Sequence, residues 1–173
     1  ALLTSTLLGR ADASEACWLS SDVAIRVSDA ADSTERAYLS PSNAGSEVDL
    51  WSSMTSSGNQ DWTIADAGSG EYTIKTAGVP TELVYLNTGD QGTVINLWSG
   101  NSTGNQRWII SDVGATGLVI IATAGTPTER LYLSASDDGD EISLASTNTS
   151  GNEQWQLMCH LPPPPPPPPS APP

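Results

Sequence analysis

The chain has 173 residues, enough for one ordinary domain with short appendages. Its 20 acidic and 6 basic side chains give a net charge of −14, which argues against nucleic acid or an anionic membrane as partner, because both are bound through Lys and Arg. No apolar run approaches the roughly 18 residues of a membrane-spanning helix, so we expect no membrane insertion.

Residues 1–16 form an N-terminal extension that we interpret as a mature N-terminus or the remnant of one, because it lacks an initiator Met and a clean signal-peptide core. Cys17 follows it, and the second of two cysteines is Cys159. An even pair near the two ends predicts a disulfide formed in an oxidising compartment; the alternative is two unrelated buried thiols.

Three internal repeats follow, at about 23–70, 71–117 and 118–160. Tyr-Leu pairs that begin at Tyr38, Tyr85 and Tyr132 recur every 47 residues. Each repeat offers four short β-rich runs separated by Gly, Asn, Ser, Asp or Pro, a pattern that predicts strands and turns. The repeats are too short to bury separate cores. A closed three-lobed barrel around a pseudo-threefold axis therefore fits better than a solenoid or a propeller.

The third strand of each repeat reads VDLW, INLW or ISLA, with aliphatic residues at its first and third positions. Side chains alternate faces along a strand, so the second and fourth positions face outward. These outward pairs are Asp49 and Trp51, Asn96 and Trp98, and Ser143 and Ala145. An outward indole can cover the apolar face of a pyranose while amides and carboxylates bind its hydroxyls, which predicts a sugar site.

An Asn-Gln-x-Trp sequence or its variant closes each repeat, as NQDW, NQRW and NEQW. Its tryptophan is retained in all three repeats inside an apolar strand, so we predict that these indoles are structural core. They are Trp62, Trp108 and Trp155.

The order of Tyr-Leu, apolar-x-Leu and Gln-x-Trp motifs, found three times in register, resembles the ricin B-type β-trefoil lectin family over about residues 23–160. The resemblance implies an all-β fold, a β-trefoil of three pseudo-threefold repeats with four strands each, which we place at residues 17–160. Trefoil termini lie close together, as a Cys17–Cys159 disulfide requires.

The resemblance also implies sugar sites built from the residue after Tyr-Leu, the outward pair and the Asn-Gln pair. The predicted sugar-binding residues are Asp49, Trp51, Asn59 and Gln60 in repeat 1, and Asn87, Asn96, Trp98, Asn105 and Gln106 in repeat 2. The Asn-Gln amides fit two roles, tying down a turn and contacting the sugar. After Tyr-Leu stand Ser40, Asn87 and Ser134, where the family usually has a carboxylate. Repeat 3, with Ala145 and Glu153, is predicted not to bind sugar.

Residues 161–173 form a polyproline tail that we expect to be a polyproline II rod, roughly 25 Å long over its eight consecutive prolines. The tail resembles the hydroxyproline-rich glycoproteins of plant and green-algal surfaces, which implies hydroxylated, O-glycosylated prolines. Alternatives are an unmodified spacer and a ligand for proline-binding domains. The prolines concerned are Pro162, Pro163, Pro164, Pro165, Pro166, Pro167, Pro168 and Pro169. N-glycosylation sequons begin at Asn101 and Asn148.

Catalysis finds no support in the motifs, because the single histidine, His160, has no catalytic or metal-ligand pattern around it. We expect no enzyme activity, no metal and no cofactor.

Two functions fit the sequence. The first is an extracellular carbohydrate-binding module on a glycosylated stalk, with glycans or hydroxyproline-rich glycoproteins of a wall, matrix or surface fibre as partners. The second is a structural subunit of an extracellular fibre, whose head contacts proteins or tail glycans without affinity for free sugar.

Overall fold

The computed structural model describes residues 17–28, 37–42, 46–52, 54, 59–78, 84–89, 94–100, 104–124, 131–136 and 141–160. The predicted N-terminal extension, the proline tail and the sequon at Asn101 lie outside these residues. Within them, no helix is long and apolar enough to cross a membrane.

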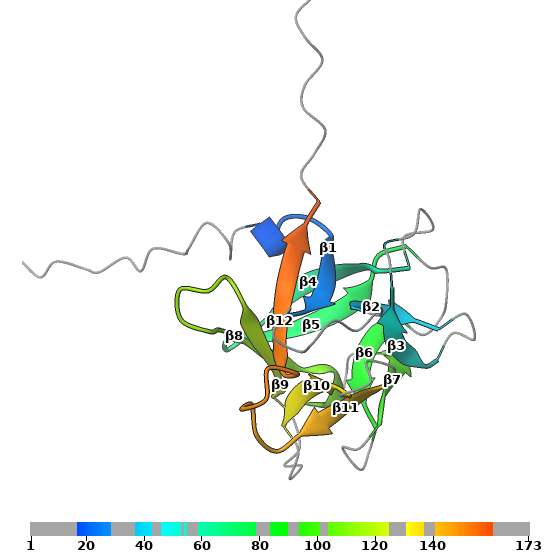
Figure 1. Cartoon of the computed structure of the whole chain (residues 1–173). Coiled ribbons are helices and arrows are strands. Elements are labelled where there is room, and N and C mark those ends of the chain that lie inside the picture. Colours follow the sequence, from blue (N-terminus) through cyan, green and yellow to red (C-terminus); the bar gives the residue numbers. More distant parts are fainter. Residues whose placement is uncertain are drawn as a thin grey trace, which may run out of the picture.

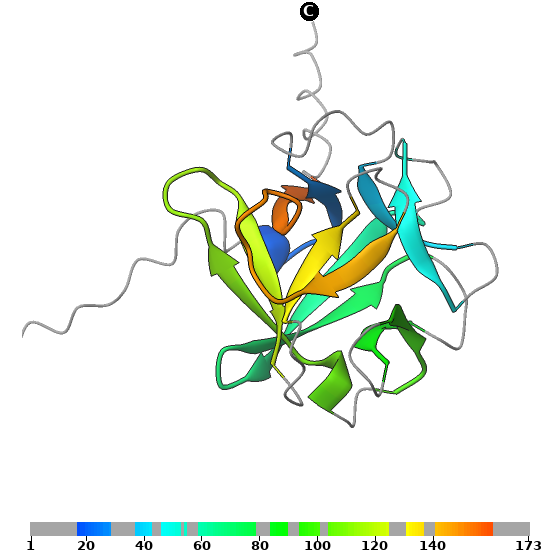
Figure 2. The ribbon, with the colours of Figure 1, turned by 60° about the horizontal axis from the view of Figure 1, so that its bottom comes forward.

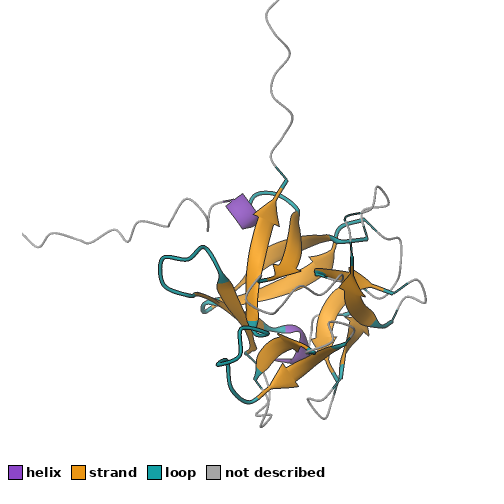
Figure 3. Cartoon of the chain, viewed as in Figure 1, coloured by secondary structure: helices purple, strands orange, loops and turns teal. Residues whose placement is uncertain are grey.

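The described residues form twelve short strands, one 3-10 turn and a short helical turn at residues 17–18 (Figure 3). In chain order the first four strands are β1 (Val23–Val27), β2 (Tyr38–Pro41), β3 (Val48–Trp51) and β4 (Asp61–Gly68). The next are β5 (Glu71–Thr76), β6 (Tyr85–Thr88), β7 (Ile95–Trp98), the turn η1 (Gly104–Gln106) and β8 (Trp108–Asp112). The last are β9 (Val119–Thr123), β10 (Tyr132–Ala135), β11 (Ile142–Ala145) and β12 (Gln154–Cys159).

Six of the strands close into a barrel. Going round it, β12 pairs with β1, β1 with β4, β4 with β5, β5 with β8, β8 with β9, and β9 again with β12, all antiparallel. The first and last strands of each repeat supply this ring. A closed ring leaves no unpaired barrel edge, which removes the usual site of edge-to-edge aggregation.

The other six strands form three hairpins, β2–β3, β6–β7 and β10–β11. The inner strands β3, β7 and β11 contact one another, so the hairpins gather at one end of the barrel (Figures 1 and 2). A six-stranded barrel with three such hairpins is a β-trefoil, and it confirms the predicted all-β fold.

The same tertiary hydrogen bond holds each repeat together. The indole Nε1 of Trp62 donates to the carbonyl of Leu39 at 2.9 Å, and Trp108 and Trp155 donate to Leu86 and Leu133 at 3.0 Å each. All three indoles are 0 % exposed. Each bond joins the last strand of a repeat to its hairpin, so the tryptophan fixes where the hairpin sits.

The predicted disulfide between Cys17 and Cys159 is confirmed. Cys159 ends β12 beside Val23, the first residue of β1, and the two cysteine Cα atoms are 6.1 Å apart. The chain therefore enters and leaves the trefoil at one place. Next to it, Trp18 stacks edge-to-face on Tyr72, with ring centroids 5.1 Å apart.

We predict that Trp108→Phe lowers the free energy of unfolding by about 1–3 kcal/mol, because the Leu86 carbonyl loses its buried donor. The smaller ring adds a cavity cost. Trp98→Phe is the matched control, because Trp98 is 51 % exposed, and it should stay within about 0.5 kcal/mol of the parent. Urea denaturation measures both, and equal losses in the two variants would contradict this role for Trp108.

Removing the disulfide should cost about 5 kcal/mol in the chain-entropy model, because it closes a loop between cysteines 142 residues apart. We expect the Cys17→Ser, Cys159→Ser double variant to unfold at a lower urea concentration than the oxidised parent. Reductant added to the parent should reproduce that shift, and it should leave the double variant unchanged. If neither the double variant nor the reduced parent unfolds at a lower urea concentration than the oxidised parent, the bond does not stabilise the head.

Candidate functional site

The outward faces of hairpins β2–β3 and β6–β7 each bring one aromatic pair and one polar pair together. In β2–β3, Tyr38 lies directly opposite Trp51 and Ser40 opposite Asp49. Directly opposed residues of an antiparallel pair share a face, with Cβ atoms about 4.5–5.5 Å apart. The aliphatic residues between them turn inward, and Leu50 is fully buried. The predicted alternation along the third strand therefore places Trp51 outward, where it is 40 % exposed.

Repeat 2 has the same arrangement with amides in place of the carboxylate and hydroxyl. Tyr85 is opposite Trp98, and Asn87 is opposite Asn96. Trp98 is 51 % exposed. The two tyrosines were not among the predicted site residues. Their signal in the sequence is a constant spacing of 13 residues from Tyr38 to Trp51 and from Tyr85 to Trp98, which sets them opposite each other across a hairpin.

A chain of amide hydrogen bonds crosses the repeat 2 site. The Gln106 side chain, on η1, donates to Asn87 Oδ1, and Asn87 Nδ2 donates to Asn96 Oδ1 at 2.7 Å. Gln106 is 2 % exposed and Asn87 5 % exposed, whereas Asn96 is half-buried. The buried glutamine thus holds the Gln-x-Trp turn against the hairpin and orients the asparagines beside Trp98.

In repeat 1 the corresponding glutamine, Gln60, donates from Nε2 to Ser40 Oγ at 3.1 Å. Both residues are buried, at 2 % exposure each. Across the hairpin from Ser40 stands the half-buried Asp49. The carboxylate that is absent after Tyr-Leu is therefore present on the same face, but on β3 instead of β2.

Repeat 3 has the same arrangement, but the hydrogen bond between the serine after Tyr-Leu and the residue before x-Trp runs in the opposite direction. Ser134 Oγ donates to the Glu153 carboxylate at 3.1 Å, and the Ser150 hydroxyl and backbone N–H donate to it at 2.9 and 3.2 Å. Opposite Tyr132 stands Ala145 instead of tryptophan. The buried part of the site survives here, and the outward indole is missing.

The predicted site residues thus fall into two layers. Gln60, Gln106 and Asn87 are buried and bonded within the protein. The outer layer contains exposed and half-buried side chains; it comprises Trp51, Trp98, Asp49, Asn96, Asn59 and Asn105. Of the predicted sequons, Asn148 is described, half-buried in the connection from β11 to β12. The described residues contain no group of three or more His, Cys, Asp or Glu that could hold a metal ion.

Residues 59–145, half of the chain, match the family described as Ricin-type beta-trefoil lectin domain-like. No curated protein matches the sequence. Among solved structures, the designed threefold-symmetric protein ThreeFoil is similar, with a TM-score of 0.61 and 20 % identity, over 79 % of this chain and 97 % of ThreeFoil.

Two further similar structures contain saccharides. One is the Polyporus squamosus lectin bound to Neu5Aca2-6Galb1-4GlcNAc, with a TM-score of 0.61 and 16 % identity, over 80 % of this chain and 49 % of the lectin. The other is SeviL bound to asialo-GM1 saccharide, with a TM-score of 0.60 and 13 % identity, over 82 % of this chain and 98 % of SeviL. This chain thus spans about half the length of the Polyporus lectin. At these identities the structures establish a shared fold, and the family match establishes membership. The chain belongs to the ricin-type β-trefoil lectin domain-like family.

Proposed function

We propose that the protein is a non-catalytic carbohydrate-binding module, with one saccharide site on hairpin β2–β3 and one on β6–β7. The observation that carries this proposal is the exposure of Trp51 and Trp98 at 40 % and 51 %, beside four tryptophans that are at most 6 % exposed. An exposed indole contributes little to the core, whereas it can cover the C–H face of a sugar ring.

The polar pair beside each indole supplies hydrogen bonds for sugar hydroxyls. In repeat 2 the bonds from Gln106 to Asn87 and from Asn87 to Asn96 fix the amides before a ligand arrives, so less side-chain entropy is lost on binding. In repeat 1 the polar group beside the indole is the half-buried Asp49 carboxylate, and a carboxylate is a strong acceptor for sugar hydroxyls. The two sites therefore differ in charge, and we infer that they prefer different saccharides.

Each site lies on the outside of a two-stranded hairpin and buries little of its ligand. We expect single-site dissociation constants in the millimolar range, about −4 kcal/mol. Two sites on one head can bind a polymer of repeated sugars more tightly than either site binds alone, provided that the polymer spans both. This favours an extended glycan of a cell wall, matrix or surface fibre as ligand.

We further propose that the protein is secreted and acts outside the cell, as a head of residues 17–160 on a stalk of residues 161–173. The disulfide supports an oxidising compartment. The resemblance of the tail to hydroxyproline-rich glycoproteins supports glycosylation of its prolines, and the sequons support N-glycans at Asn101 and Asn148.

The indoles are tested by Trp51→Ala and Trp98→Ala on a glycan array. Each variant should raise the dissociation constant at its own site about tenfold or more, and the double variant should lose binding. Ile109→Ala is the control, because Ile109 is 41 % exposed on barrel strand β8, outside hairpins β2–β3 and β6–β7, and the variant should bind as the parent does. A parent that binds no glycan, or a double variant that binds like the parent, would refute the proposed function.

The carboxylate in repeat 1 is tested by Asp49→Asn, which keeps the shape and removes the charge. In a Trp98→Ala background, where only repeat 1 remains, we expect affinity to fall about tenfold or more, since a hydrogen bond to a charged group contributes about 1.5–3 kcal/mol. In a Trp51→Ala background, where only repeat 2 remains, affinity should stay unchanged. Equal losses in both backgrounds would indicate a general folding defect, and no loss in either would exclude Asp49 from the site.

A further inference from the structure

The outward faces of hairpins β2–β3 and β6–β7 are joined into one surface. The backbone of Glu47, just before β3, bridges to Asn96 of β7 in antiparallel register, and Leu97 N–H donates to the Ser46 carbonyl at 2.8 Å. Paired residues share a face, and Glu47 lies an even number of residues from Trp51, as Asn96 does from Trp98. Both indoles therefore stand on the same side of this joined surface.

The register also gives the spacing of the two indoles. Trp51 lies four residues beyond Glu47 and Trp98 two residues beyond Asn96, in opposite directions along the antiparallel pair. At about 3.4 Å per residue, the indoles stand roughly 20 Å apart along the strands. Each has a tyrosine opposite it, Tyr38 and Tyr85. We call the surface bearing these four rings the Trp51–Trp98 face.

The chain itself contains a segment whose chemistry and length suit this face. Proline-rich segments bind to surfaces lined by tryptophan and tyrosine, because the polyproline II helix is already extended and its ring faces are apolar. The run Pro162–Pro169 has eight prolines, roughly 25 Å in that conformation, so one run is long enough to contact both indoles.

The direction of β12 favours a contact with another copy over a contact with the same head. In β12, Trp155 pairs with Val27, which leads into hairpin β2–β3, whereas Cys159 pairs with Val23 at the other end of the barrel. The last strand thus leads away from the hairpins, as its upward course in Figure 1 shows. Consecutive prolines favour the extended polyproline II conformation, so we expect a run that begins two residues after His160 to reach another copy more readily than its own head.

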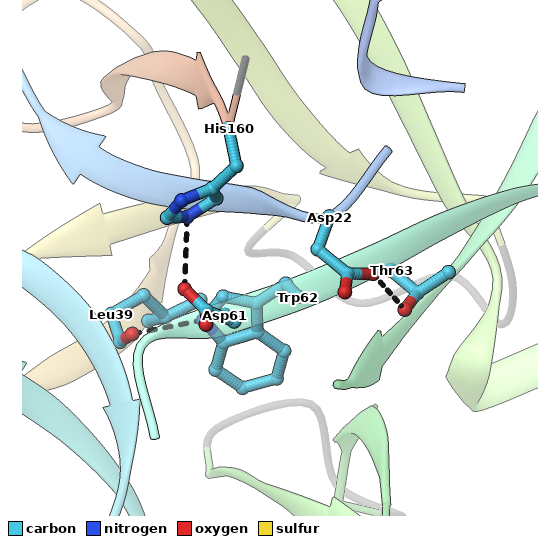
Figure 4. A network of polar contacts seen from close by, with 6 residues as sticks. All are labelled: Asp22, Leu39, Asp61, Trp62, Thr63 and His160. Carbon is cyan, nitrogen blue, oxygen red and sulfur yellow. Dashed lines mark hydrogen bonds and ion pairs between the residues drawn. The ribbon is translucent and has the colours of Figure 1, made fainter. Parts of the chain in front are cut away.

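His160 is held at this exit by two contacts. Its Nε2 lies 2.9 Å from Asp61 Oδ1 (Figure 4), and its backbone N–H donates to the Asp22 carbonyl at 3.2 Å. The Asp22 side chain in turn accepts a hydrogen bond of 2.8 Å from Thr63 on β4. These contacts fix β12 to β4 at His160, so the direction of the last strand is defined.

We propose that the octaproline run Pro162–Pro169 of one copy binds across the Trp51–Trp98 face of another copy, so that chains assemble head to tail. The two contacting surfaces are different, and such a contact builds open chains unless its rotation closes a ring. The contact requires no affinity for sugar, so it stands independently of the proposed lectin function. It is made by unmodified prolines, so glycosylation of the run would compete with it.

The charge distribution favours this ligand over an ionic partner. Residues 161–173 contain no charged side chain, whereas the chain as a whole has a net charge of −14. Neighbouring heads repel one another at low ionic strength, and salt screens that repulsion. Added salt should therefore maintain or strengthen the self-association, whereas a contact made by ion pairs would weaken.

The test uses the full chain, produced with unmodified prolines, in sedimentation velocity over a wide concentration range. We expect larger species to form as concentration rises and to dissociate when a synthetic, unmodified Leu161–Pro173 peptide is added in excess. In a ¹H–¹⁵N spectrum the same peptide should shift the indole signals of Trp51 and Trp98 and leave that of Trp108 in place. A peptide of equal length made of Gly and Ser should do neither.

Trp51→Ala and Trp98→Ala should each raise the dissociation constant of the peptide about tenfold or more, because one proline run contacts both rings. Ile109→Ala should change nothing. A chain that stays monomeric while the peptide moves neither indole would overturn the proposal. The proposal would also be overturned if the Trp51–Trp98 face bound only a native tail with glycosylated hydroxyproline, because the contact would then be made by tail glycans. If the parent binds the peptide but no glycan on the array, only the lectin function is refuted. If it binds glycan but not the peptide, only this inference is refuted.

Discussion

Three buried hydrogen bonds, each from a tryptophan indole to a leucine carbonyl, position everything else in the head. Trp62, Trp108 and Trp155 reach from the barrel to the hairpin of their own repeat, at 2.9–3.0 Å, with no exposed surface. An indole N–H buried without an acceptor is costly, so the hairpin carbonyl must lie where the indole points. The repeated tryptophan is therefore a structural element, and its spacing of 46 or 47 residues follows from the threefold architecture.

Because buried hydrogen bonds hold the hairpins in place, the outward residues can vary without loss of the fold. Repeat 1 presents the Asp49 carboxylate, repeat 2 presents Asn96, and repeat 3 has lost its indole to Ala145. Below all three lies the same bond between the residue after Tyr-Leu and the residue before x-Trp, although Gln donates it in repeats 1 and 2 and Glu accepts it in repeat 3. One scaffold thus holds two chemically different candidate sites and one surface without an outward indole.

Much of this could be predicted from the sequence, because repeats and alternation depend on local spacing. The period of the motifs gave the threefold barrel, the position of the two cysteines predicted their disulfide, and the alternation along VDLW and INLW placed Trp51 and Trp98 outward. These features depend on which face of a strand a residue occupies, and a period of two residues determines that.

What the sequence could not show depends on contacts between segments. The burial of Gln60 and Gln106 results from the turn closing over the hairpin, so the sequence could not show that these amides bond to the hairpin. The position of Asp49 opposite Ser40 requires the hairpin register. The bridge between Glu47 and Asn96 joins two repeats, and no motif within one repeat encodes it.

The repeated tryptophans form the frame, and we propose that the outward tryptophans bind ligand. Hydrogen exchange of the indole N–H groups, followed by NMR, distinguishes these two roles. We predict that the indoles of Trp62, Trp108 and Trp155 exchange only as slowly as the whole head unfolds, since each is buried and bonded to a carbonyl. Those of Trp51 and Trp98 should exchange quickly and become protected when ligand is added. Fast exchange at the three buried indoles, or protection of Trp51 and Trp98 in ligand-free protein at concentrations where it is monomeric, would show that these roles are wrong.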